Sequence, residues 1–88
     1  MPHQLKTNGD IVLVEPANKQ AFTLEELQKL VGGFIEIVQT KGGTSMVINE
    51  EGKLKGLPIN EMATQVYQHG DVDPIVGDVL VCNPRYIK

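Results

Sequence analysis

The residues with the clearest potential for chemistry in this 88-residue chain are one histidine and two aspartates in its last third. His69, Asp71 and Asp73 follow one another at intervals of two residues, so that an imidazole and two carboxylates could surround one metal ion. A metal site normally needs three or four converging ligands, and no other feature of the sequence completes this set. We therefore interpret the segment as a solvated loop after a helix and predict no metal site.

A second candidate site lies where two lysines precede the expected start of a helix. Asn60 is of a residue type that caps helices, and the exposed amides of a helix N-terminus favour phosphate or carboxylate. The candidate ligand- or partner-binding residues are Lys53, Lys55, Asn60 and Glu61. Three neighbouring glutamates oppose the charge of the lysines. The alternative is that the Glu-Gly turn and the Leu-Pro step before the helix serve backbone geometry alone.

Nucleophilic or acid–base catalysis has no recognisable basis in this sequence. Cys82 lies in an apolar run, where we expect a small buried residue with a raised thiol pKa and not a nucleophile. His3 and His69 stand in no Ser-His-Asp or Cys-His spacing. Gly77-Asp78 precedes a strand, whereas a dinucleotide fingerprint opens a helix after one. We therefore predict a protein that is not an enzyme and has no cofactor.

Composition places the chain among small globular domains. Of its residues 41% are hydrophobic and 22% are charged, and the formal net charge is −3. The lysines are scattered and form no basic stripe, so nucleic acid binding is not expected. A single cysteine excludes an internal disulfide and suits a reducing compartment. Because no apolar run approaches the roughly 18 residues of a membrane span, we expect a cytoplasmic protein without membrane contact.

The elements that must position these residues are expected in the order β-α-β-β-α-β. The first helix is the clearest, because Thr23-Leu24-Glu25-Glu26 forms a capping box and Gly32-Gly33 ends the helix. A second helix begins at Asn60 and ends at His69-Gly70. The four expected strands cover residues 11–14, 34–39, 44–49 and 79–82. The first and last of them are apolar on both faces, which predicts positions inside the sheet or covered from both sides.

Each element has one apolar face to bury, which predicts an α+β fold of two layers. We expect a single domain over residues 1–88, in which residues 1–10 are a flexible N-terminal segment. Its core is a mixed sheet of about four strands with two helices on one face, a ferredoxin-like sandwich being one of the open arrangements. Since so small a chain buries a modest core, a homodimer is a further possibility.

The run Asn-Glu-Glu-Gly-Lys-Leu-Lys-Gly-Leu-Pro at residues 49–58 resembles part of a family of small domains without an assigned function. Further matches are Asn60, Ala63-Thr64 and Val-Gly-Asp-Val-Leu-Val at residues 76–81. The resemblance covers the chain from about Phe34 to Cys82. The family is found in bacteria, phages and other mobile elements. The resemblance therefore implies a fold and a phage-related or mobile-element context, but no activity.

Two functions are consistent with these features. The first is a small non-enzymatic binding module for a protein partner, contacted through an uncovered sheet face with Glu36 or Ser45, or through the edge of an outer strand. The alternative is a protein that binds or sequesters a nucleotide or other small anion at Lys53, Lys55 and the helix start at Asn60, completed across a dimer interface. Charge reversal at Lys55 should abolish anion binding and barely affect a sheet-face contact.

Overall fold

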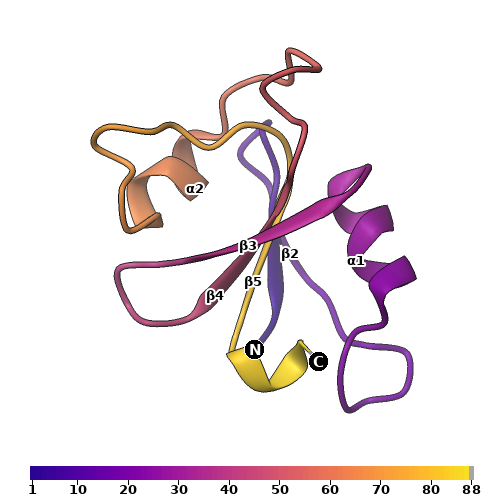
Figure 1. The fold of residues 1–88 in the computed structure, drawn as a ribbon. Coiled ribbons are helices and arrows are strands. Elements are labelled where there is room, and N and C mark those ends of the chain that lie inside the picture. Colours follow the sequence, from indigo (N-terminus) through magenta and orange to yellow (C-terminus); the bar gives the residue numbers. More distant parts are fainter. Residues whose placement is uncertain (88) are drawn as a thin grey trace.

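The computed structural model describes residues 1–87 and shows a five-stranded sheet with a helix on either side (Figure 1). The elements are β1 (His3–Leu5), β2 (Ile11–Leu13), α1 (Leu24–Val31), β3 (Ile35–Gln39), β4 (Ser45–Asn49), α2 (Glu61–Val66) and β5 (Val79–Cys82), followed by a 3₁₀ turn at Pro84–Tyr86. The strand order is β2-β1-β5-β4-β3, with all neighbours antiparallel. The expected α+β class is confirmed, whereas the mixed four-stranded sheet and the β-α-β-β-α-β order are wrong.

The additional strand comes from the segment that was expected to be flexible. β1 lies inside the sheet, where His3 stands opposite Leu13 of β2 on one side and Val81 of β5 on the other. Leu5 is only 5% exposed, and the side chain of Gln4 donates a hydrogen bond of 2.9 Å to the carbonyl oxygen of Leu30. Three residues are too few to show the alternation by which a strand is recognised in sequence.

For the apolar run at residues 11–14, the predicted position in the sheet is wrong. Its pattern predicts an interior strand, but β2 is an outer strand that pairs only with β1. Its side chains are exposed, Ile11 at 62%, Val12 at 41% and Leu13 at 68%. For β5 the same prediction is confirmed, because this strand lies at the centre of the sheet and all four of its residues are buried.

The two helices cover opposite faces of the sheet, which corrects the expectation of two layers with both helices on one face (Figure 1). Successive side chains of a strand point to opposite faces. In β5, Val79 and Val81 therefore pack in one cluster with Ala63 of α2. Leu80 lies on the other face and packs in a second cluster with Leu27 of α1. The domain thus has three layers, α1, sheet and α2.

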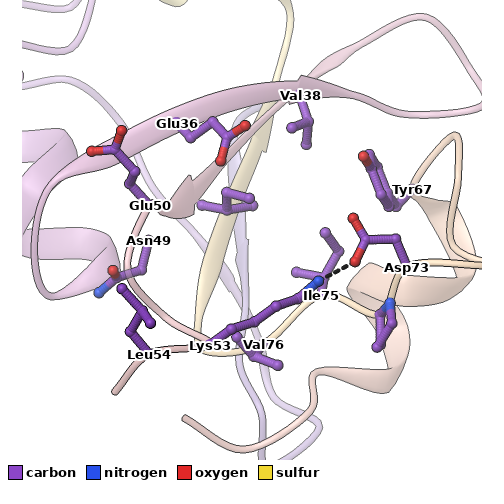
Figure 2. Close-up of a pocket in the computed structure, with 12 residues that line it drawn as sticks. Glu36, Val38, Asn49, Glu50, Lys53, Leu54, Tyr67, Asp73, Ile75 and Val76 are labelled. Carbon is purple, nitrogen blue, oxygen red and sulfur yellow. Dashed lines mark hydrogen bonds and ion pairs between the residues drawn. The ribbon is translucent and has the colours of Figure 1, made fainter. Parts of the chain in front are cut away.

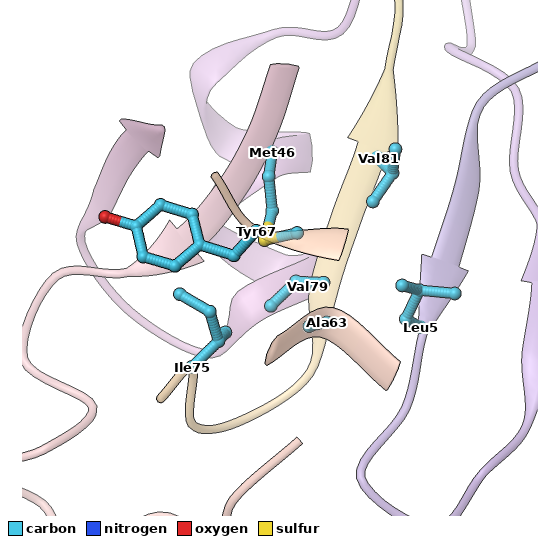
Figure 3. Close-up of a cluster of buried hydrophobic side chains, with 7 residues drawn as sticks. All are labelled: Leu5, Met46, Ala63, Tyr67, Ile75, Val79 and Val81. Carbon is cyan, nitrogen blue, oxygen red and sulfur yellow. The ribbon is translucent and has the colours of Figure 1, made fainter. Parts of the chain in front are cut away.

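One of the two clusters of buried side chains lies on the α2 face (Figure 3). Its buried members are Leu5, Met46, Ala63, Tyr67, Ile75, Val79 and Val81. The six residues of α2 span about 9 Å at 1.5 Å per residue. Five strands at a spacing of about 4.8 Å span about 19 Å, so α2 cannot cover the whole of this face.

Helix α1 begins and ends as its sequence predicts. The hydroxyl of Thr23 accepts from the backbone N–H of Glu26, and the Glu26 carboxylate accepts from the N–H of Thr23 and also from that of Ala17. These hydrogen bonds to backbone amides hold the pKa of Glu26 below its ordinary value. Gly32 ends the helix in the left-handed conformation, at φ 82°. The predicted capping box is therefore confirmed.

Candidate functional site

The motif segment after β4 lines a cavity of about 140 Å³ at the β3 side of the sheet (Figure 2). Asn49, Glu50, Lys53 and Leu54 contribute to its wall, together with Val76 from the second motif. The remaining wall comes from β3, from Ile48 of β4, from the residue that follows α2 and from the loop before β5. Segments far apart in the sequence therefore meet around the residues that carry the family resemblance.

The cavity is acidic. Glu36, Glu50 and Asp73 supply three carboxylates against the one ammonium of Lys53, a net charge of −2. Lys53 forms an ion pair with Asp73, and this pair is half-exposed, so that it contributes at most about 1 kcal/mol of stability. Within residues 1–87, Glu36 and Glu50 have no ion-pair partner. The charge of the cavity therefore favours a cation.

Tyr67 forms part of the cavity wall directly after α2. It is only 9% exposed, and its backbone N–H caps the helix by donating to the carbonyl oxygen of Ala63 at 2.9 Å. The phenol hydroxyl makes no hydrogen bond to any other residue in 1–87, and Figure 2 shows it at the cavity. No buried side-chain nitrogen or oxygen of the described residues lacks a partner, so this hydroxyl is open to solvent and can accept a hydrogen bond from a ligand.

The four candidate residues around Asn60 lie in different surroundings. The predicted N-cap is confirmed, since the Oδ1 of Asn60 accepts from the N–H of Ala63 at 3.1 Å. Its Nδ2 donates to the carbonyl oxygens of Leu5 at 2.8 Å and Gly77 at 2.9 Å. Asn60 is 1% exposed and has no polar group left for a ligand. It ties α2 to β1 and to the turn before β5.

The charged members of that set have other surroundings. Lys53 is engaged with Asp73, and the ammonium of Lys55 extends toward Gly33, where an added Cβ would stand 2.9 Å from it. Glu61 is exposed in the first turn of α2. Helix α2 ends at Val66, earlier than the predicted His69-Gly70. Of the four residues, Asn60 is therefore buried and Lys53 is paired, whereas Lys55 and Glu61 are exposed.

The His69, Asp71 and Asp73 segment is likewise divided among different contacts. Asp73 pairs with Lys53, and the ring of His69 meets that of Tyr67 edge to face, with 5.7 Å between the ring centroids. Among the residues described, no group of three or more His, Cys, Asp or Glu side chains is arranged to hold a metal ion. Cys82 is buried on the α1 face, and this burial raises its pKa to about 11, as expected for a thiol without nucleophilic character.

Glu36 and Ser45 do not share an uncovered sheet face. Glu36 stands opposite Ile48 in the β3–β4 pair and faces the α2 side. Ser45 stands opposite Cys82 on the α1 side and is 7% exposed. A helix packs on each face, and of the two residues only Glu36 is exposed.

The outer edge of β2 is a second candidate site, which the sequence pattern placed inside the sheet. The N–H of Lys6 donates to the Asp10 carbonyl at 2.9 Å, and that of Val14 to the Pro2 carbonyl at 3.1 Å. In an antiparallel pair, bonded and non-bonded positions alternate. The N–H and C=O groups of Ile11 and Leu13 therefore point away from β1. No other segment of residues 1–87 pairs with this edge.

The opposite edge of the sheet is partly closed. Beyond β3, the carbonyl oxygen of Gln39 accepts from the N–H of Gln68 at 3.0 Å, and Thr40 forms a bridge with Tyr67. β3 also presents Glu36 at its surface, a charge of the kind that discourages edge-to-edge pairing. Within residues 1–87 no segment pairs with the outer edge of β2, and β2 itself contains no charged residue. The two edges of this sheet are therefore not equivalent.

An apolar groove of about 470 Å³ adjoins β2 on the α2 face. Leu5 and Ile11 of the first two strands line it, with Met62 and Val66 of α2 on the other side. This groove is the part of the sheet face that α2 does not reach. It continues the exposed apolar surface from Ile11 toward the helix.

The strands and helices form a small α+β domain with an antiparallel sheet between two helices. Among the residues described, no helix is long and apolar enough to cross a membrane. The chain matches the family model Domain of unknown function (DUF3846) over residues 7–86, and it therefore belongs to this family. The match confirms the resemblance and extends it beyond residues 34–82. No curated protein and no solved structure matches the chain.

Proposed function

We propose that this domain is a small non-enzymatic binding module that contacts a protein partner by adding a strand of that partner to the outer edge of β2. The observation that carries the proposal is the unprotected apolar edge, with Ile11 62% and Leu13 68% exposed. Soluble proteins usually blunt such edges with lysine, proline or a bulge. Strand addition would bury these side chains and satisfy the outward backbone groups.

The energetics indicate that the partner contacts more than β2. Burying the exposed parts of Ile11 and Leu13 contributes about 1–2 kcal/mol each, and four backbone hydrogen bonds contribute about 1 kcal/mol each. Association costs about 4–15 kcal/mol in lost freedom of movement. A three-residue strand alone therefore binds weakly. The groove beside Ile11 offers additional apolar area, so the partner strand would also carry apolar side chains that enter it.

The same edge admits a second copy of the chain as the partner, because an antiparallel pair of identical strands is compatible with two-fold symmetry. A cytoplasmic location and a phage-related or mobile-element context are part of this proposal. They rest on the single unoxidised cysteine and on the family resemblance. A small anion as ligand has less support, because Asn60 is fully hydrogen-bonded within the fold and Lys53 is paired.

The test is a binding comparison with Leu13→Pro. The N–H of Leu13 points outward, so proline removes a donor for the partner and leaves the β1–β2 ladder intact. Leu54→Lys is the matched control, because Leu54 is 89% exposed and lies away from β2. We expect the wild-type protein and the control to capture the same protein stoichiometrically, or to dimerise in light scattering, and Leu13→Pro to do neither. Equal capture and equal mass for all three proteins would contradict strand addition.

A further inference from the structure

We propose that the acidic cavity beside β3 and β4 binds an organic cation, namely an alkylammonium or alkylguanidinium group of the kind carried by lysine and arginine side chains. The cavity lies at the β3 side of the sheet and β2 forms the opposite edge. The two sites are therefore independent, and either proposal can fail without the other.

The negative charge of the cavity favours a positively charged ligand. Lys53 already places an ammonium in this cavity, where it pairs with Asp73. The carboxylates of Glu36 and Glu50 line the same cavity, and neither is neutralised by another residue in the described part of the chain. A second cation would complete the pairing that Lys53 begins.

The walls select an organic cation over a metal ion. The carboxylates of the described residues are not grouped closely enough to hold a metal. Between them, Val38, Ile48 and Ile75 form an apolar surface, which suits the methylene stem that lysine and arginine side chains bury beneath a charged head. The ring of Tyr67 stands beside this surface and offers a cation–π contact.

Tyr67 supplies a polar group at the cavity. Tyr67 is only 9% exposed, and its hydroxyl has no hydrogen-bond partner within residues 1–87. Because no buried side-chain nitrogen or oxygen of these residues lacks a partner, the hydroxyl is open to solvent, which a ligand in the cavity would replace. Figure 2 shows the hydroxyl and the carboxylate of Glu36 on two sides of the cavity, with the Lys53–Asp73 pair nearby. The phenol oxygen can accept a hydrogen bond from an ammonium or guanidinium N–H.

The experiment is an NMR titration of the ¹⁵N-labelled protein with n-butylammonium and n-butylguanidinium chloride. n-Butanoate is the matched control ligand, because it has a similar apolar stem and the opposite charge. We expect saturable shifts of the amides of Glu36, Val38 and Tyr67 with either cation and none with butanoate. Equal responses to butanoate and butylammonium would overturn the proposal.

Variants test which groups hold the cation. Glu36→Gln and Glu50→Gln should each weaken binding by about five-fold, as expected for one partly screened charge near the ligand. Tyr67→Phe, which keeps the ring and its packing, should weaken it about three-fold through the lost hydroxyl. Glu25→Gln is the control, because Glu25 is exposed in the first turn of α1 on the other face. Unchanged affinity in the Glu36→Gln/Glu50→Gln double variant would refute the site.

A peptide distinguishes the two sources of such a cation. Acetyl-Gly-Lys-Gly-amide carries the same ammonium and stem as butylammonium but within a polypeptide. Tighter binding of the peptide would support the side chain of a protein as the ligand, and exclusive binding of the free amine would support a small molecule. Leu13→Pro should leave both affinities unchanged, which separates this result from strand addition at β2.

Discussion

Replacing Asn60 by alanine should destabilise this domain more than any ordinary loss of a helix cap. The buried amide of Asn60 makes three hydrogen bonds, which join α2, β1 and the turn before β5. Two of them are donated to the carbonyl oxygens of Leu5 and Gly77, which lie 55 and 17 residues away in the sequence. Alanine removes the cap and leaves both carbonyl oxygens without this donor.

The expected loss in the free energy of unfolding follows from these hydrogen bonds. An N-cap contributes about 1 kcal/mol, and each buried carbonyl left unsatisfied costs about 1–3 kcal/mol. Together they predict a loss of about 3–7 kcal/mol for Asn60→Ala. A domain of this size has a free energy of unfolding of about 5–10 kcal/mol. The variant should therefore fold only marginally.

Urea denaturation followed by circular dichroism measures the effect. With an m value of about 1 kcal/mol per molar urea, the midpoint should fall by about 3 M or more. Asn60→Asp and Asn60→Ser separate the two roles of the side chain, because both residues cap helices as well as asparagine does but cannot replace the two donated hydrogen bonds. If either variant is as stable as the wild type, Asn60 acts only as a cap and the reasoning is refuted.

Three further outcomes follow from local geometry. Because burial raises the pKa of Cys82 to about 11, only roughly one thiol in a thousand ionises at pH 8. A thiol reagent such as DTNB should therefore react slowly until urea unfolds the chain, and rapid reaction of the native protein would contradict burial. The lowered pKa of Glu26 adds stability that is present above the unfolded pKa and is lost as the pH falls through the folded one. Thermal melting of the wild type should thus decline more steeply below pH 5 than that of Glu26→Gln, whose amide keeps the capping acceptor, and parallel curves would disprove the assignment. Gly70→Ala should lower the free energy of unfolding by about 2–4 kcal/mol, because the added Cβ would overlap the carbonyl oxygen of Thr64; an unchanged urea midpoint would show that this turn can move.

Local signals in the sequence predict both ends of α1 and the start of α2, but not the end of α2 at Val66. The Thr23–Glu26 capping box, the stop at Gly32 and the cap at Asn60 all occur in the structure. Each depends on hydrogen bonds between residues at most four apart, so the sequence alone contains the necessary information. The hairpin between β3 and β4 is predictable for the same reason, since its turn residues adjoin the strands that they connect.

Strand position depends on information that no single segment contains. Residues 11–14 and 79–82 are both short apolar runs, yet one forms the outer strand β2 and the other the central strand β5. What distinguishes them is the pairing of β1, whose three residues give no periodic signal. The two-sided apolar pattern of β5 does indicate cover on both faces, and the structure provides it with α2 against Val79 and α1 against Leu80. A two-layer arrangement, with both helices on one side of the sheet, could not have covered both faces of β5.

The candidate cavity was predictable only in part, for a similar reason. The resemblance singled out residues 49–58, which include Lys53, but the residues that face Lys53 come from elsewhere. Asp73 lies 20 residues further along the chain, and Glu36 reaches the cavity through the pairing of β3 with β4. Such a site appears only after the fold has brought distant segments together, which is why its acidic residues could not be grouped from the sequence.

The two ends of α2 determine which surfaces of this domain are open. Asn60 fixes the start of the helix to β1, and after Val66 the backbone of Tyr67 is extended, at φ −66° and ψ 139°, and bridges to Thr40. The helix is therefore held across the middle of its sheet face. The apolar groove remains on the β2 side and the acidic cavity on the β3 side. Because α2 ends at Val66, Tyr67 lies outside the helix, bridges to Thr40 and forms part of the cavity wall, so the end of α2 bears directly on the shape of this cavity.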